Sequence, residues 1–383
     1  MQVNTVDVPD PGRGKPYIAI VAGNARQRSI LARCLTSFYQ FAEYPDVAQA
    51  VAGCRTHVPL LALVSEQLPP GGGFDLVRRF RLDPGLASIP IVVLAGKDDK
   101  VTRDGALQCG ADSLLVEPFS RSALVTAVSG LLNRGVERKW KTLRPLQRQA
   151  LSDTLLLFNG ISNVISEGKP IPYQGVSDAC QPLVEAVAND DFKEMLDGVK
   201  DHDNYSFAHS MRVATYLSLF GCNLRLPKEE QILLASGGLL HDIGKMSIPH
   251  QVLNKPGRLN EAERAVMEGH VTASVAYLEH CQDLPKGIIT IAAQHHEKVD
   301  GTGYPRGLAG SKLNRLARIA CIVDVFTALT DRRVYKPPIE AEAALKFMVD
   351  EMDSQLDAKL LGLFRQMLLD ASGDIHRQME RSA

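Results

Sequence analysis

The chain lacks any close pair of cysteines. Its seven cysteines stand singly among 383 residues, with no C-x-x-C spacing. An odd, unpaired set is typical of proteins from reducing compartments and not of disulfide scaffolds. The N-terminus MQVNTVDVPDPGRGKPY has no apolar core of a secretory signal, and no segment reaches about 18 uninterrupted apolar residues. We therefore expect a soluble cytoplasmic protein without a membrane span.

The chain also lacks a net charge. It has 43 lysines and arginines against 44 aspartates and glutamates, which leaves a formal charge of -1 at pH 7. A balance of this kind gives no bulk attraction to a nucleic-acid polymer or to a membrane surface. The length exceeds what one ordinary core accommodates, so we expect two or three domains.

Short apolar runs alternate with helical patterns in the N-terminal part. The runs are Tyr17–Ala22, Leu60–Val64, Ile89–Ala95 and Ser113–Val116. Buried strands that alternate with helices are typical of a parallel sheet covered on both faces. Residues 15–133 are therefore predicted to form a doubly wound α/β domain.

This domain resembles the receiver domain of two-component response regulators. The resemblance lies in IAIVA, PPGGGFDLVRRFR, IPIVVLA and GADSLLVEPF. The residues that receivers use for phosphorylation are replaced, however. Where receivers carry two acids, the phosphoacceptor aspartate, a hydroxyl residue and a lysine, this chain has Ala22, Gly23, Ser65, Ala95 and Glu117. Magnesium needs oxygen ligands, and a serine cannot form an acyl phosphate, so we predict a receiver that is not phosphorylated and that serves as a docking or dimerisation module.

The middle segment, residues 134–200, is predicted to be a helical linker and the start of a helical domain. Leu146–Glu167 carries apolar residues at helical spacing after Pro145. Two interpretations remain open. The helix packs on its own domain, or it also pairs with a second copy of the chain and forms a homodimer.

Residues 201–383 read almost entirely as helix, with a glycine-rich loop from about Glu297 to Asn314. Eight of the ten histidines lie between positions 202 and 296, and Asp324 lies in an apolar helical run where a buried carboxylate is costly without a cation. Imidazoles and carboxylates on packed helices are typical metal ligands. The candidates are His209, His241, Asp242, His270, His295, His296 and Asp324.

Some of these histidines have simpler explanations. His209 or His270 alone would more often be a surface or capping residue, and an HH pair can interact with a helix dipole at a C-terminus. Nothing connects His202, His250 or His280 to the cluster. Taken together, the set favours a metal centre over these separate explanations.

Three motifs make this part similar to the HD-GYP subgroup of the HD phosphohydrolases. They are HDIGK at His241–Lys245, KPG at Lys255–Gly257 and HHEKVDGTGYP at His295–Pro305. Members of this family hydrolyse cyclic di-GMP, a bacterial second messenger, to pGpG or GMP. A receiver joined to such a domain is a familiar arrangement in bacterial response regulators.

The resemblance implies a role for each candidate ligand. Asp242 would bridge two divalent ions, iron or manganese being usual. His209, His241 and Asp324 would complete the first ion's ligands, and His270, His295 and His296 those of the second. Tyr205 stands where some relatives use a glutamate for a third ion, so we expect two ions.

Two ions would share a hydroxide that attacks phosphorus in line with the leaving 3′-oxygen. The resemblance places Lys245 near the phosphate and Asp242 at the reacting centre. It assigns substrate contacts to Arg333, Lys336 and the loop residues Gly303, Tyr304 and Pro305. Tyr304 would stack on a guanine or anchor the loop, and the loop or the receiver is also a candidate surface for a partner protein.

Two departures from the family pattern leave the substrate affinity and the catalytic rate open. Lys298 occupies a position where the family commonly has arginine, and Thr327 occupies one where it commonly has aspartate. Lysine lacks the forked guanidinium geometry of arginine. The predicted function is a two-metal cyclic di-GMP phosphodiesterase. The alternative is a catalytically weak module that binds the dinucleotide or docks a partner. The complete ligand set favours the enzyme.

Overall fold

The computed structural model describes residues 16–35, 39–253, 255, 257–281, 283–331 and 339–381. They form two compact units, and the chain passes from the first to the second between Glu137 and Arg138. None of the helices in the described ranges is long and apolar enough to cross a membrane.

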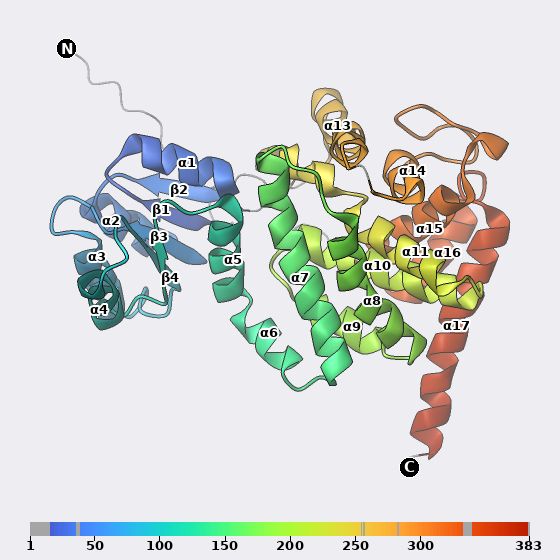
Figure 1. Ribbon diagram of the computed structural model, residues 1–383, viewed down its shortest axis with the longest axis horizontal. Coiled ribbons are helices and arrows are strands. Elements are labelled where there is room, and N and C mark those ends of the chain that lie inside the picture. Colours follow the sequence, from blue (N-terminus) through green and yellow to red (C-terminus); the bar gives the residue numbers. More distant parts are fainter. Residues whose placement is uncertain are drawn as a thin grey trace. The chain divides into compact units, whose positions relative to one another are not determined.

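The first unit is built on a five-stranded parallel sheet with the order β2-β1-β3-β4-β5 (Figure 1). Four strands coincide with the predicted apolar runs. The sequence did not indicate β2, because its sequence FAEY contains a glutamate and forms no apolar run. The strands are β1 (Ile18–Val21), β2 (Phe41–Tyr44), β3 (Leu61–Ser65), β4 (Ile91–Ala95) and β5 (Ser113–Val116).

Helices cover both faces of this sheet, because alternate strand residues point to opposite sides. Ala19 and Val21 pack with α2, α3 and α4, whereas Ile18 and Ile20 pack with α1 and α5. The predicted doubly wound α/β architecture is confirmed. The helices are α1 (Ala25–Leu35), α2 (Val47–Thr56), α3 (Gly73–Leu82), α4 (Lys100–Cys109) and α5 (Arg121–Leu132).

The second unit is helical, as predicted. Its first part consists of α6 (Arg134–Trp140), which begins just before the boundary, then α7 (Pro145–Ser166), α8 (Tyr173–Ala188), α9 (Phe192–Val199), α10 (Tyr205–Asn223) and α11 (Lys228–Leu240). The elements that follow along the chain are η1 (Ile243–Ser247), α12 (His250–Leu253), α13 (Glu261–Glu279), α14 (Lys286–Gln294), η2 (Gly310–Lys312), α15 (Arg315–Thr330), α16 (Ala341–Glu351) and α17 (Ala358–Arg381).

Helix α7 packs on the helical unit itself. Leu151, Phe158 and Ile161 on its apolar face are at most 2% exposed, and the ring of Phe158 meets that of Phe207 edge-on at 5.7 Å. The predicted apolar stripe is therefore largely used within the unit. Pairing of this helix with a second copy stays a prediction, for which the exposed Leu156 is available.

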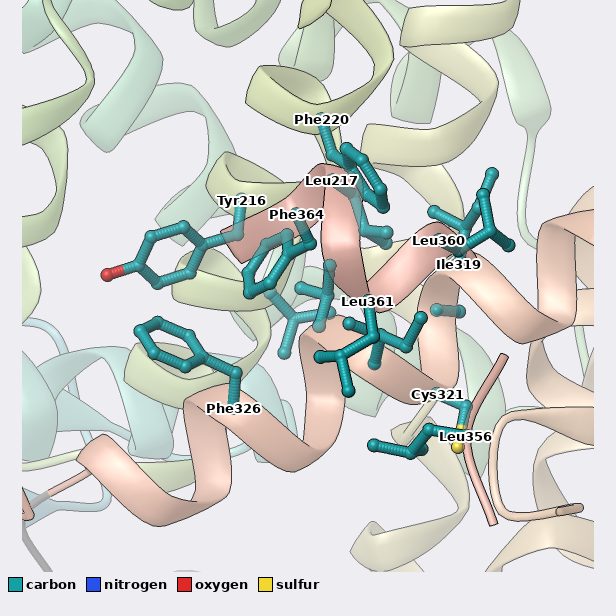
Figure 2. Packing of buried hydrophobic residues seen from close by; sticks show 14 of the residues in the cluster. Tyr216, Leu217, Phe220, Ile319, Cys321, Phe326, Leu356, Leu360, Leu361 and Phe364 are labelled. Atoms are coloured by element: carbon teal, nitrogen blue, oxygen red, sulfur yellow. The ribbon is translucent and has the colours of Figure 1, made fainter. Parts of the chain in front are cut away.

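An aromatic core fixes the last helix of the unit against α10 and α15. Figure 2 shows Phe364 of α17 among Tyr216, Phe220 and Phe326. Its ring lies 5.3 Å from those of Phe220 and Phe326 and 6.4 Å from that of Tyr216, all edge-to-face. Such pairs contribute about 0.5–1.5 kcal/mol beyond their buried area. The core thus holds together α10 and α15, the two helices that carry His209 and Asp324.

Candidate metal centre

All seven predicted ligand side chains converge in the second unit. They come from α10, the C-terminal end of α11, α13, the end of α14 and α15. These side chains form two groups, and within each group the ligand atoms lie within 4.8 Å of one another. One group is His209, His241 and Asp324, and the other is Asp242, His270, His295 and His296.

The carboxylate of Asp242 lies between the two groups. Its Oδ1 lies 3.1 Å from His270 Nε2 and 3.6 Å from His295 Nε2. Its Oδ2 lies 3.1 Å from His241 Nε2 and 3.7 Å from His209 Nε2. Each oxygen thus faces a different set of imidazoles, which is the arrangement a bridging carboxylate requires.

Asp324 faces three imidazoles of the cluster. Its Oδ1 lies 3.0 Å from His209 Nε2 and 3.7 Å from His241 Nε2, and its Oδ2 lies 3.7 Å from His296 Nδ1. The carboxylate is only 5% exposed, so it needs the compensation that cationic or metal partners supply.

The donor set fits divalent cations. Backbone carbonyl oxygens orient three of the imidazole rings. They accept hydrogen bonds from Nδ1 of His241, His270 and His295 at 2.6–2.9 Å. Their Nε2 atoms and Asp242 Oδ1 are buried and have no hydrogen-bond partner of good geometry among the described residues. Buried polar atoms are normally satisfied, so four such atoms, shared between the two ligand groups, indicate a site for ions.

At this centre, burial and the charges of neighbouring side chains shift the pKa values of the ligands in opposite directions. Burial disfavours ionisation of Asp242, but His241 and Lys245 hold the pKa of its carboxyl well below the usual range. Burial lowers the pKa of the His241 imidazole, but Asp242 and Asp324 together outweigh burial and raise this pKa to about 10. Burial keeps the pKa of His295 below its ordinary value. A cation that binds neutral imidazoles would displace the protons that the carboxylates otherwise attract to the cluster.

Close backbone contacts bring the ligand-bearing elements together. A Cβ on Gly238 would lie 2.8 Å from the Cα of Ala214, so this glycine lets α11 approach α10. A Cβ on Gly244 would lie 2.1 Å from the carbonyl oxygen of His270, and the Gly244 N–H donates to Ser274 Oγ at 2.9 Å. The glycine of HDIGK therefore sets the distance between the HD pair and α13.

The glycine-rich loop folds back on the end of α14. Glu297 is 1% exposed, and its carboxylate accepts backbone N–H bonds from Arg306 at 2.7 Å and Leu308 at 2.8 Å. A Cβ on Gly303 would lie 2.5 Å from the carbonyl oxygen of His296. The ring of Tyr304 stacks on His296 at 4.7 Å, the packing expected of a loop anchor, whereas stacking on a guanine stays a prediction.

The remaining predicted residues have varied surroundings. Lys245 contacts Oδ2 of Asp242 and its side chain is 20% exposed, so it lies at the edge of the centre. Arg333 and Lys336 lie outside the described residues. His202, left out of the cluster, stacks on Trp140 instead, and the exposed His280 ends α13.

Two buried carboxylates near the centre received no role from the sequence. Glu297 anchors the loop, and Asp331 accepts a hydrogen bond from Nδ1 of His209 at 2.7 Å. Glu297 lies within the motif HHEKVDGTGYP, which could have identified it. For Asp331, the sequence offered only its spacing. It follows Asp324 by seven residues, or two helical turns, which places both on the same helical face.

Comparison with known families agrees with this geometry. Residues 18–129 match the response regulator receiver domain, and residues 194–360 match the HD domain. The chain thus matches a receiver domain in its first unit and an HD domain in its second. The HD match spans every candidate metal ligand. The resemblance to receivers and to HD hydrolases is confirmed at the level of the domains.

Some curated relatives match most of this chain, and others match less than half of it. The cyclic di-GMP phosphodiesterase response regulator RpfG of Xanthomonas campestris is 28% identical over 83% of this chain and 78% of its own length. A cyclic di-GMP phosphodiesterase of Pseudomonas aeruginosa is 34% identical over 43% of this chain, and this chain covers 40% of it. A 3′3′-cGAMP-specific phosphodiesterase of Vibrio cholerae is 34% identical over 43% of this chain and 35% of its own length.

In the receiver domain, the carboxyl ends of the strands surround a cavity of about 580 Å³ without the usual acids. Ser65 ends β3 and is 4% exposed, and Ala95 ends β4. Glu117 Oε1 accepts a hydrogen bond from Gln27 Nε2 at 2.8 Å. These side chains offer neither a phosphoacceptor carboxylate nor a lysine at position 117.

Acetyl phosphate is expected to leave the receiver domain unmodified, and Ser65→Ala is expected to leave turnover unchanged. The physical reason is that a serine cannot form the acyl phosphate of a receiver and that Glu117 repels a phosphoryl group. Intact-mass measurement with and without Mg²⁺ checks the first point, and a turnover assay the second. A stable Mg²⁺-dependent adduct, or a large loss in the variant, contradicts this view.

Proposed function

We propose that this protein hydrolyses cyclic di-GMP with two divalent metal ions. The observation that carries the proposal is Asp242, whose two oxygens face different imidazoles of one buried cluster. The choice of substrate is supported by RpfG, because that relative is similar across both the receiver and the HD domain. Bound as proposed, the ions supply Lewis acidity that activates a water and neutralises phosphate oxygens.

The chain's own residues would divide the remaining work. Asp242 would hold both ions, with His209, His241 and Asp324 on one side and His270, His295 and His296 on the other. Lys245, at the exposed edge and bound to Asp242, would orient that carboxylate and meet the phosphate. Tyr304, stacked on His296, would keep the loop against the centre.

The finer parts of the proposal come from the family pattern and not from geometry. Iron or manganese would be the ions, pGpG or GMP the product, and the receiver domain a docking or dimerisation module. An HD domain that only binds the dinucleotide is the alternative. Four buried polar atoms without hydrogen-bond partners, shared between the two ligand groups, favour a metal-loaded enzyme.

Turnover assays with a defined metal load test the activity. Protein loaded with Mn²⁺ or Fe²⁺ is expected to convert cyclic di-GMP into linear product, because the metal supplies the activated water. Removal of the ions with EDTA is expected to abolish product, and adding either metal back to restore it. Chromatography of the nucleotides measures both the rate and the end product.

The assay needs two comparisons. His280→Ala changes an exposed histidine outside the cluster and is expected to turn over like the unmodified protein. 3′3′-cGAMP is the competing substrate, because some relatives over the HD domain are specific for it. No product from cyclic di-GMP in the metal-loaded protein, together with tight binding of it, would support the binding module instead.

A further inference from the structure

His209 has a carboxylate at each nitrogen of its ring. Nε2 lies 3.0 Å from Oδ1 of Asp324, and Nδ1 lies 2.7 Å from Oδ2 of Asp331. The side chains of His209 and Asp331 are only 4% and 5% exposed, so both groups are removed from water. A carboxylate at this depth is retained at a cost, which suggests a function for Asp331.

The other well-oriented imidazoles of the cluster are held differently. Nδ1 of His241 bonds to the Gly238 carbonyl, that of His270 to Met267 and that of His295 to Ala292. Each acceptor lies three residues earlier in the chain, so local helical geometry supplies it. His209 lies within α10 and takes its partner from the end of α15, 122 residues away. Its orientation therefore depends on a side chain that a mutation can remove.

Arg212 holds Asp331 in place. Its Nε lies 2.6 Å from Oδ1 of Asp331 in an ion pair whose angle does not suit a hydrogen bond, and its Nη2 donates to Thr330 Oγ1 at 3.0 Å. Arg212 follows His209 by three residues on α10, so the two side chains share a face. The guanidinium of Arg212 contacts Oδ1 of Asp331 and compensates the buried negative charge of this carboxylate. Oδ2 of Asp331 is then available to the imidazole of His209.

We propose that Asp331 is a positioning residue that fixes His209 with its proton on Nδ1 and its Nε2 lone pair toward the ion beside Asp324, with Arg212 holding Asp331. The inference rests on the proposed two-metal centre. A carboxylate only accepts hydrogen bonds, so the ring nitrogen that faces it must carry the proton. Carboxylates behind metal-binding histidines act in this way, and their loss typically costs about 10- to 100-fold in metal affinity.

Asp331→Asn tests the proposal. Arg212 only donates, so it keeps the amide oxygen, and the amide NH₂ then faces Nδ1 of His209. That contact places the ring proton on Nε2, the wrong tautomer for a ligand. The expected result is that one of two ions binds about 10- to 100-fold more weakly while the other keeps its affinity. Titration with Mn²⁺ followed by electron paramagnetic resonance measures both affinities in the full chain.

Two further variants separate positioning from folding. Asp197→Asn is the matched control, because Asp197 lines the same cavity of about 390 Å³ as Arg212 and Asp331, and it is expected to bind both ions normally. The double variant Arg212→Met, Asp331→Leu replaces the ion pair with apolar side chains of similar size, an exchange that often preserves stability. It is expected to unfold at the unmodified protein's temperature in EDTA and still to lose one ion.

Two results would overturn the proposal. One is full affinity for both ions in Asp331→Asn or in the double variant. The other is an equal loss of both ions in the single variant, which would make Asp331 a general structural residue. The readout is independent of substrate. Normal metal titrations without hydrolysis of cyclic di-GMP would count against the proposed function and leave the role of Asp331 standing.

Discussion

Asp242→Asn is expected to remove ions from both halves of the metal centre and to abolish turnover. Oδ1 faces His270 and His295, whereas Oδ2 faces His241 and His209. An amide keeps one oxygen, but its NH₂ cannot bind a cation, and the bridging charge is lost. Metal affinity should therefore fall by more than the roughly 10- to 100-fold typical of residues that act behind a ligand. Metal analysis after dialysis and chromatography of cyclic di-GMP products measure the two effects.

Two comparisons make this result specific. Asp353→Asn alters an exposed aspartate of the same domain and is expected to change neither metal content nor turnover. Asp324→Asn removes a carboxylate that faces mainly His209 and His241, so one ion should be affected more than the other. Two tightly bound ions per chain in Asp242→Asn, or unchanged hydrolysis, would show that the carboxylate does not bridge.

The fold followed from sequence where burial imposes a pattern. Strands β1, β3, β4 and β5 are continuous apolar runs, since both faces of a parallel sheet are covered. Strand β2 left no such run. It lies at the sheet edge, and its sequence FAEY includes Glu43, which pairs with Arg28 at 3.2 Å. The other edge strand, β5, was predicted because its sequence SLLV contains an aliphatic run, whereas the glutamate in FAEY leaves β2 without one.

The site was predictable where its residues cluster in motifs. His241 and Asp242 are neighbours, as are His295 and His296, so resemblance to one family identified them together. Asp331 was not identified, because its meaning depends on His209, which lies 122 residues earlier. Local patterns report helical faces and turns. They carry no information about which distant side chain an aspartate will meet, so residues that orient ligands need the tertiary structure.

Substitution of Gly244 tests whether close packing at this glycine of the HDIGK motif holds Asp242 next to His270. In Gly244→Ala the new Cβ would lie 2.1 Å from the carbonyl oxygen of His270 and 2.6 Å from the backbone nitrogen of Ser274. Neither backbone atom can move unless η1 shifts away from α13, which would separate Asp242 from His270. Overpacking of this kind costs about 1–3 kcal/mol of unfolding free energy. We expect that loss in the metal-free protein, together with weaker metal binding.

Gly269→Ala is the matched control, because Gly269 precedes His270 on α13 and a Cβ there meets nothing within 4 Å. Replacing an exposed helical glycine with alanine should stabilise the protein by about 0.5–1 kcal/mol. Unfolding of a two-domain chain is not a single transition, but the only tryptophan, Trp140, is buried in the helical unit, and its fluorescence follows that unit in denaturant. If both variants proved equally stable and bound metal equally well, close contact at Gly244 would not be what holds Asp242 beside His270.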